Sequence, residues 1–300
     1  PVYAQLMANG GIKVKYYNTT EVYNLFSVQH RSHRKLLIID GEKALTGGRN
    51  IADDYFDLSQ HYNFLDSDVL IHGSIVKNIQ SSFDLYWNSN LAADHKSLAE
   101  STTPEELEKA LDYLRPQVED FEIQKKIEEL AKNQILPEDI CNHTIFVTDF
   151  PGVGESHRKI YPTLLKLIAE TKNNIFVESP YFVLRQEGYD EFKKLVDRNL
   201  KVTVLTNGLY STDAFYIISP ILLFKNWISK IGLDLYLYQG EPLKNNHLKL
   251  FENQNRWGIH AKRAVLDEKT ALIGTYNIDP RSANLNSEVM LVCKDNPEFA

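Results

Sequence analysis

The 300-residue sequence is poor in cysteine, with Cys141 and Cys293 as its only two. Two cysteines are too few for the disulfide framework that stabilises many small secreted proteins. Each one lies in an apolar stretch, so we expect two buried, structural thiols. A reducing compartment fits this pattern best, although a bacterial periplasmic protein or an injected protein would show the same two residues.

Long apolar runs and an excess of positive charge are also missing. The longest apolar run, residues 214–224, is interrupted by Ser219 and Pro220, so it predicts a core segment rather than a membrane span. A segment that dips into a membrane interface is the alternative. The formal net charge of −7 is unusual for a protein that coats nucleic acid, so we expect no nucleic-acid partner.

What the sequence does contain is one pattern written twice, H-x-K-x4-D-x6-G-x-x-N. The first copy consists of His33, Lys35, Asp40, Gly47 with Gly48, and Asn50. The second copy consists of His260, Lys262, Asp267, Gly274 with Thr275, and Asn277. Each copy fixes several residue types at set distances, so the repetition is not a chance event.

The pattern predicts a phosphate site built from both copies. In an extended strand, side chains two residues apart share a face, which would place each histidine beside its lysine. Two histidines, two lysines and two asparagine amides around one cavity can hold a phosphate and stabilise its negative charge. The lysines supply the positive charge, so we expect neither a metal ion nor another cofactor.

Two histidines at one phosphate allow covalent catalysis. One imidazole attacks phosphorus and becomes a phosphohistidine, while the other protonates the departing alkoxide and later deprotonates the incoming water or alcohol.

Each imidazole also needs a partner that orients its second nitrogen. Asp68 and Glu288 open similar segments, DVLI and EVML, at 35 and 28 residues after the motif histidines (68 − 33 and 288 − 260). We therefore assign Asp68 and Glu288 to this role, without deciding which histidine each serves. The alternative is that both are ordinary acidic residues at a strand edge.

Several other residues in or near the motifs are candidates for structural or supporting roles. Asp40 and Asp267 follow short apolar strands, so we expect them to stabilise turns, and Gly47, Gly48, Gly274 and Thr275 to be structural. Glu178 ends a strand that leads toward the site and is either a supporting acid or a strand terminator. Arg31 would share a face with His33 and could reach a phosphate, but a surface arginine is an equal alternative.

The chain divides into two similar halves. Strands expected at 144–148, 174–178 and 201–206 alternate with helices at 161–170 and 189–198, which indicates an α/β layered fold. Residues 3–18 match 192–207, and each segment leads to one motif copy. We therefore predict a first half over 1–95 that lacks its leading strand, a helical connector over 96–140, and a second half over 141–300. The connector begins with a capping box at Thr103 and Glu106 and is expected to break near Pro116.

These motifs resemble those of the phospholipase D superfamily, whose members carry paired H-x-K motifs. The segments GGRNIADDYF (47–56), DSDVL (66–70), SPYFV (179–183) and GTYNIDPRS (274–282) look like the bacterial cardiolipin synthase C branch. The resemblance implies a duplicated α/β sandwich of two pseudo-symmetric halves, each with a central mixed sheet flanked by helices. It also implies that His33 is the nucleophile and His260 the general acid, and that Thr275 replaces a serine while keeping the hydroxyl.

The resemblance predicts a phosphatidyl transferase or phospholipase D. Its substrate would be a glycerophospholipid at a membrane surface, and its product cardiolipin or phosphatidic acid. A metal-independent nuclease of the same superfamily is the alternative. We expect a peripheral protein on the cytoplasmic face of a bacterial membrane, with a periplasmic or secreted location also open. The sequence leaves the oligomeric state open.

Overall fold

The computed structural model describes residues 2–19, 29–59, 61–98, 102–118, 124–125, 128–129, 132, 141, 143–241 and 256–300. Its backbone contacts divide the chain into two compact units. The larger unit comprises residues 29–85 and 139–300, and the smaller unit comprises residues 1–28 and 86–138. Both copies of the repeated motif lie in the larger unit.

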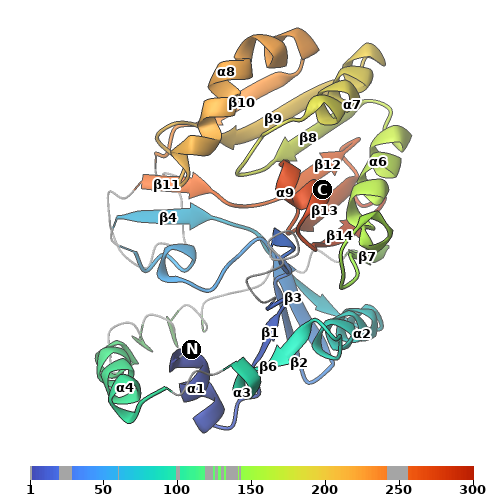
Figure 1. Cartoon of the computed structure of the whole chain (residues 1–300). Coiled ribbons are helices and arrows are strands. Elements are labelled where there is room, and N and C mark those ends of the chain that lie inside the picture. Colours follow the sequence, from blue (N-terminus) through green and yellow to red (C-terminus); the bar gives the residue numbers. More distant parts are fainter. Residues whose placement is uncertain are drawn as a thin grey trace. The chain divides into compact units, whose positions relative to one another are not determined.

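The second half of the chain contains a seven-stranded sheet, with the order β10-β9-β8-β12-β13-β14-β7 (Figure 1). The strands are β7 (Thr144–Thr148), β8 (Asn174–Glu178), β9 (Lys201–Asn207), β10 (Asp234–Tyr238), β12 (Arg263–Leu266), β13 (Thr270–Gly274) and β14 (Val289–Cys293). β8, β9 and β10 are parallel to one another, and the other neighbours are antiparallel. The mixed sheet and the three strands expected in this half are confirmed.

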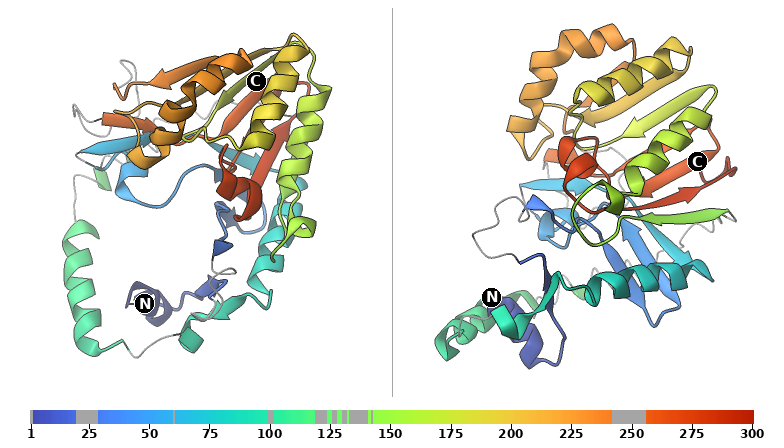
Figure 2. Two further views of the ribbon diagram at one scale, coloured as in Figure 1. Left: turned by 45° about the horizontal axis from the view of Figure 1, so that its top comes forward. Right: turned by 45° about the vertical axis from the view of Figure 1, so that its right-hand side comes forward.

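Helices cover one face of this sheet (Figure 2). They are α6 (Ile160–Glu170), α7 (Gln186–Asp197), α8 (Phe215–Ile231) and the short α9 (Pro280–Asn284). Their apolar side chains, such as Leu167, Leu195 and Ile221, pack against Val204 and Met290 of the sheet and form the main core. The run 214–224 thus lies largely in α8. No helix among the described residues, α8 included, is long and apolar enough to span a bilayer.

The first half contributes a smaller sheet to the same unit. Its strands are β2 (Leu36–Ile39), β3 (Lys43–Gly47) and β5 (Asp68–His72), followed by α2 (Ile75–Trp87). The antiparallel order β2-β3-β5 repeats that of β12-β13-β14 in the second half. Ala44 and Ile71 pack against Phe146 and Leu291, so the two sheets share an apolar layer as in a sandwich.

The first-half sheet differs from its expected mixed form, because its three described strands are all antiparallel. The strand that could add a parallel neighbour, β1 (Lys15–Tyr17), pairs instead with β6 (Ala92–Asp94) in the smaller unit.

The smaller unit also contains α1 (Val2–Asn9), α3 (His95–Leu98) and α4 (Pro104–Val118). The capping box of α4 is confirmed: the Thr103 N–H donates to the Glu106 carboxylate at 2.8 Å, and the Glu106 N–H donates to the Thr103 hydroxyl at 3.2 Å. The helix continues through Pro116, so the break expected there is not present. Much of the segment 119–140 lies outside the described residues. The predicted division into two halves and a connector, with boundaries at residues 95 and 140, stays a prediction. The two compact units are defined by backbone contacts and do not test it.

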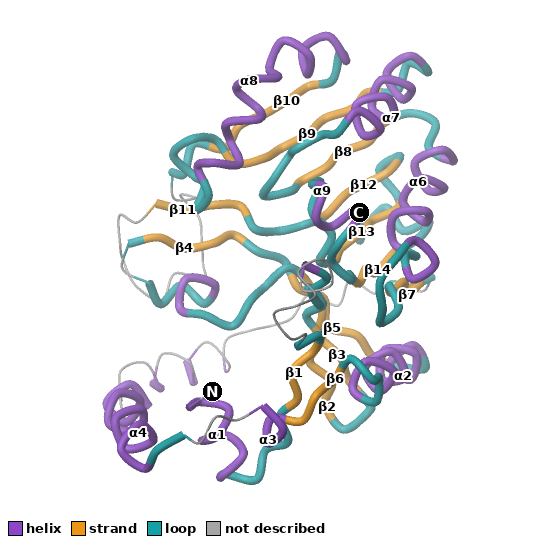
Figure 3. The backbone as a smooth tube through the Cα atoms, viewed as in Figure 1, coloured by secondary structure: helices purple, strands orange, loops and turns teal. Residues whose placement is uncertain are grey.

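Two short parallel β pairings link the motif-bearing segments of the two halves. β4 (Tyr62–Leu65) pairs in parallel with β11 (Arg256–Ile259), and Figure 3 shows the two strands side by side. A second parallel bridge joins Ser32 to Ser287. Two 3-10 turns, η2 (Asp53–Tyr55) and η3 (Glu155–His157), complete the described elements.

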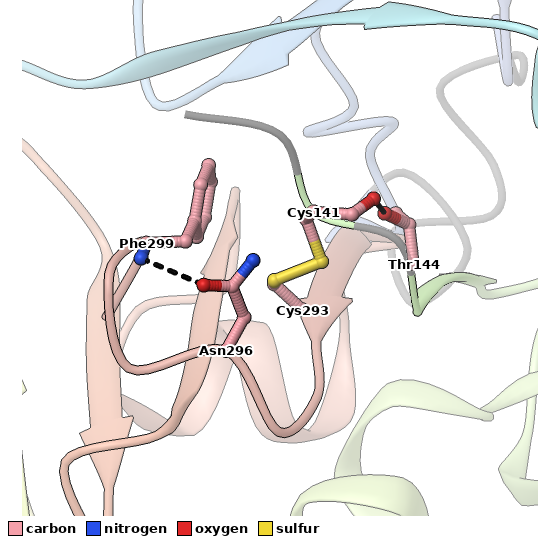
Figure 4. Close-up of a disulfide and its surroundings, with 5 residues drawn as sticks. All are labelled: Cys141, Thr144, Cys293, Asn296 and Phe299. Carbon is pink, nitrogen blue, oxygen red and sulfur yellow. Dashed lines mark hydrogen bonds between the residues drawn. A yellow bond between two sulfur atoms is a disulfide. The ribbon is translucent and has the colours of Figure 1, made fainter. Parts of the chain in front are cut away.

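The two cysteines form a disulfide, which corrects the expectation of two free thiols. Cys141, just before β7, is bonded to Cys293 at the end of β14, with a Cα–Cα distance of 5.8 Å (Figure 4). β7 and β14 are neighbours, and Thr144 pairs with Cys293 in their register. Composition alone could not reveal the bond, because 152 residues separate the two cysteines.

We expect the disulfide to stabilise the protein. Replacing both cysteines, Cys141→Ser with Cys293→Ser, should lower the free energy of unfolding by about 2–4 kcal/mol, because the unfolded chain loses a long closed loop. Urea denaturation with and without a reducing agent measures this. Reduction should weaken the wild-type protein by a similar amount and leave the double variant unchanged. Alkylation of two free thiols in the unreduced, denatured wild type would contradict the bond.

Candidate active site

The first imidazole–carboxylate pair forms where β4 and β11 end. In their register Ile259 lies opposite Leu65, so the next residues, His260 and Asp66, leave the ribbon side by side. The Nδ1 atom of His260 donates to a carboxylate oxygen of Asp66 at 2.7 Å. The Asp66 side chain is 0% exposed and that of His260 only 6%. The histidine of one motif copy is thus held by a carboxylate from the other half.

The second pair forms in the same way at the other bridge. Ser32 pairs with Ser287, and the next residues, His33 and Glu288, are again adjacent. The Nδ1 atom of His33 donates to a Glu288 oxygen at 2.8 Å. The Glu288 carboxylate is fully buried and also accepts hydrogen bonds from the hydroxyls of Thr275 and Ser282. Both imidazoles are therefore fixed through Nδ1, which leaves Nε2 of each available.

The assignment of Asp68 as an imidazole partner is wrong, and Asp66 holds that position. Asp68 begins β5, and its carboxylate accepts a hydrogen bond from Nε of Arg49 at 2.6 Å. The overlay of repeats favoured Asp68 because it matches Glu288. The register of β4 on β11 decides otherwise, and it could not be read from the sequence of either half. The signal available was the first acid, Asp66, of the D-S-D triplet at 66–68.

The histidine and lysine of each motif lie just before a strand rather than within it. β2 begins at Leu36 and β12 at Arg263, so the expected placement on one strand face is not what the structure has. Each lysine instead turns back onto its own histidine. Nζ of Lys35 donates to the His33 carbonyl at 2.9 Å, and Nζ of Lys262 donates to the His260 carbonyl. The two copies thus share one local geometry.

Lys262 is buried and Lys35 is partly buried, which lowers the pKa of both ammonium groups. Burial lowers the pKa of Lys262 to about 7 and that of Lys35 to about 8, while the charges of Asp66 and Glu288 act in the opposite direction on each. Each lysine interacts electrostatically with the carboxylates of both pairs, so the two motif copies form one charged cluster. Among the described residues, no group of three or more His, Cys, Asp or Glu side chains is arranged to bind a metal ion.

Aromatic rings pack around His260. The ring of Tyr55 meets the imidazole edge-on at a centroid distance of 4.9 Å, and the ring of Phe64 lies 5.1 Å away. Burial, with a further contribution from the Lys262 charge, lowers the pKa of His260 to about 4. His260 is therefore neutral at neutral pH.

The Asp66 carboxylate remains ionised beside this neutral imidazole. Burial by itself would raise the pKa of Asp66, but the hydrogen bond from His260 and the Lys262 charge outweigh it, and the pKa lies below its usual value. The result is an anionic acceptor at Nδ1, which leaves a lone pair on Nε2 of His260.

The two motif asparagines have different surroundings. The amide nitrogen of Asn50 donates to the Tyr55 hydroxyl at 2.7 Å. Asn277 is buried, and its side-chain oxygen has no hydrogen-bond partner among the described residues. Since a buried polar atom is costly without a partner, and the two ends of an amide are interchangeable by a flip, this group suits a ligand.

The motif glycines allow the segments to pass at close range, as expected. A Cβ atom on Gly48 would lie 2.3 Å from a carboxylate oxygen of Asp66 and 2.9 Å from the His260 carbonyl. A Cβ atom on Gly47 would lie 2.2 Å from the Ser67 carbonyl, and one on Gly274 would lie 2.2 Å from the Val289 carbonyl. Larger residues at these positions would displace the carboxylate-bearing segments.

The two motif aspartates lie in turns, as predicted. Asp40 and Asp267 have positive φ angles of 53° and 51°. The Asp267 carboxylate accepts hydrogen bonds from three successive backbone N–H groups, those of residues 172–174. Both therefore shape the backbone after the apolar strand.

The remaining two candidates, Glu178 and Arg31, contact neither imidazole through any of their described hydrogen bonds. Glu178 is buried and accepts a hydrogen bond from Nε of Arg263 at 2.6 Å. Arg31 is exposed, and its backbone carbonyl accepts from the Ser287 N–H at 2.9 Å. It thus supports the bridge that positions His33.

Comparisons with known proteins show what the sequence resembles. Residues 164–300 match the family described as "Cardiolipin synthase, PLD-like domain". An uncharacterised protein of Helicobacter pylori is 30% identical over 284 residues, which cover 91% of this chain and 56% of that protein. Cardiolipin synthase C of Escherichia coli is 26% identical over 296 residues, covering 88% of this chain and 59% of the relative. The chain thus spans little more than half the length of these relatives.

A solved structure supports the fold. The phosphatidylserine synthase of Haemophilus influenzae aligns with a TM-score of 0.58 at 15% sequence identity. The alignment covers 89% of this chain and 58% of that chain. The chain therefore shares the mixed α/β fold of this synthase.

The position of the His260 proton tests the revised carboxylate. In Asp66→Asn the amide can donate to Nδ1, so the proton should move from Nδ1 to Nε2, whereas Asp68→Asn should leave the imidazole unchanged. The ¹⁵N chemical shifts of the His260 ring report which nitrogen carries the proton. A shift change in Asp68→Asn but not in Asp66→Asn would contradict the pairing.

Proposed function

We propose that this chain transfers phosphatidyl groups through a phosphohistidine. The match of residues 164–300 to a phospholipase D-like domain and the fold of the chain support this proposal. One observation carries the proposal: two imidazoles, each held at Nδ1 by a buried carboxylate from the opposite half, share a cluster with the buried Lys262 and the partly buried Lys35. This arrangement supplies a nucleophile, an acid and positive charge for a phosphodiester.

In the first step, Nε2 of one histidine attacks phosphorus. A P–N bond forms, the P–O bond to the leaving alcohol breaks, and the second histidine gives its proton to the departing oxygen. In the second step, the same second histidine takes a proton from water or an alcohol. The oxygen of that acceptor then forms a new P–O bond, the P–N bond breaks, and the first histidine is restored.

We assign the attack to His260 and the proton transfer to His33. The family resemblance implies the reverse order. However, the pKa of His260, lowered to about 4 by burial, keeps its imidazole neutral at neutral pH, as a nucleophile requires. A general acid must hold a proton and exchange it with solvent. The His33 side chain is 24% exposed against 6% for His260, which suits that role.

Lys35, Lys262 and Asn277 would bind the phosphate oxygens. The lysines bring positive charge into a buried site, where it acts strongly on the negative charge that develops at phosphorus. A bound phosphate would in turn raise the pKa of each lysine and keep it charged. The side-chain oxygen of Asn277 has no partner among the described residues, and a flip of the amide would let its nitrogen donate to one phosphate oxygen.

The lipid identity of the substrate rests on the relatives. Identity of 26% to a cardiolipin synthase over 88% of this chain supports a glycerophospholipid donor such as phosphatidylglycerol or phosphatidylethanolamine. Transfer to a phosphatidylglycerol hydroxyl would give cardiolipin, and transfer to water would give phosphatidic acid. The protein would meet these lipids at a membrane surface. The disulfide favours an oxidising compartment, such as a periplasm, over the cytoplasmic face, because such bonds persist under oxidising conditions.

Product analysis tests the proposed function. Vesicles of labelled phosphatidylglycerol should yield cardiolipin or phosphatidic acid, and His33→Ala should lower the rate by about 10²- to 10⁴-fold, the usual contribution of a general acid–base group. Thin-layer chromatography separates the products. Plasmid DNA in EDTA serves as the comparison substrate. Cleavage of the DNA with no lipid product would replace the proposal with a nuclease.

The roles of the two histidines can be separated with phosphatidyl-p-nitrophenol, whose leaving group needs no proton. His33→Ala should release one equivalent of nitrophenolate in a burst and then stall, because the intermediate forms without an acid but lacks a base for its hydrolysis. His260→Ala should give no burst. Stopped-flow absorbance measures both. A burst in His260→Ala, with none in His33→Ala, would restore the reverse order.

A further inference from the structure

A large apolar cavity lies between the helices and the seven-stranded sheet. Its volume is about 390 Å³, and its lining comes from α6, α7 and α9 on one side and β8, β12 and β13 on the other. Figure 2 shows these helices lying over these strands. Cavities of this size and apolar character are typical of ligand sites, whereas the interiors of domains are otherwise closely packed.

The cavity is continuous with the candidate active site. Lys262 lines it, so one side chain belongs both to the cavity wall and to the charged cluster. Ala264 and Leu266 of β12 also line the cavity, and Lys262 directly precedes this strand. A ligand whose charged group lies at Lys262 can therefore extend along β12 beneath the helices.

Away from Lys262 most of the cavity wall is apolar, and charged residues also line it. Leu164 and Ile168 of α6 and Phe192 of α7 are among its apolar lining residues. The exposed residues Glu155 and Arg185 also line it and mark its solvent side. A lining that combines a buried cation with extensive apolar walls suits an elongated ligand with one anionic end.

We propose that this cavity binds one acyl chain of the donor phospholipid while the phosphate lies at Lys262. The proposal rests on the phosphatidyl transfer proposed above and adds a specific subsite to it. The apolar walls remove the methylene groups from water, and each buried methylene adds to binding. The cavity thus makes the enzyme select long-chain donors.

Filling the cavity tests this subsite. Ala264→Phe adds a ring to the wall, and Ala169→Phe makes the same change at an exposed position of α6 that does not line the cavity. The ratio of kcat/KM for dihexadecanoyl- over dihexanoyl-phosphatidylglycerol should fall about tenfold in Ala264→Phe, as expected when about two methylene groups lose their burial. The ratio should not change in Ala169→Phe.

A binding measurement separates the subsite from catalysis. cis-Parinaric acid, a fluorescent single-chain fatty acid, should bind to the wild type and to His260→Ala, and binding to Ala264→Phe should weaken about tenfold. Leu164→Trp, which enlarges the opposite wall, provides a second variant if Ala264→Phe does not fold, with circular dichroism as the check.

The two proposals fail in different ways. Unchanged parinaric acid binding and an unchanged chain-length ratio in the folded cavity variants would overturn the acyl subsite. If the wild type turns over neither phospholipid but still binds the fatty acid in the cavity, the proposed function fails and the subsite remains. Loss of binding in both Ala264→Phe and Ala169→Phe would also overturn it, because the effect would then not belong to the cavity.

Discussion

The candidate site depends on one constraint, the register of two short parallel bridges between the halves. Ile259 pairs with Leu65, and Ser32 pairs with Ser287. The residue after each bridge is a histidine on one side and a carboxylic acid on the other. A shift of one residue at either bridge would move the acid away from the imidazole, since successive side chains in an extended segment point in opposite directions.

The motif glycines let the bridged segments approach closely, and burial of the site changes the pKa values of its side chains. Gly47, Gly48 and Gly274 leave no room for a side chain where the acid-bearing segments pass, so the carboxylates come within hydrogen-bond distance. Burial then lowers the pKa of His260 and of both motif lysines. Buried charges are costly when alone, and the compact cluster balances two carboxylates against two lysines. The chemistry follows from this balance rather than from any single residue.

The two copies are similar in layout but not equivalent. The strand order β2-β3-β5 repeats β12-β13-β14, and each motif lysine contacts the carbonyl of its own histidine. His260 is packed against the rings of Tyr55 and Phe64 and is shielded from solvent, whereas the His33 side chain is partly exposed. The apolar cavity also opens onto Lys262 and is lined by the helices of the second half. The two halves thus repeat one layout but place their motif histidines in different surroundings.

The sequence by itself determined the motif residues, the α/β alternation of the second half and the capping box at Thr103, because each is a local pattern of spacing and residue type. It identified Glu288 as a partner but chose Asp68 over Asp66, because the overlay of repeats carries no information on how one half is registered against the other. It also missed the Cys141–Cys293 bond. Those features join residues more than 100 positions apart, and the pKa values of His260 and the lysines depend on burial that only the packed chain creates. Only the tertiary structure decided them.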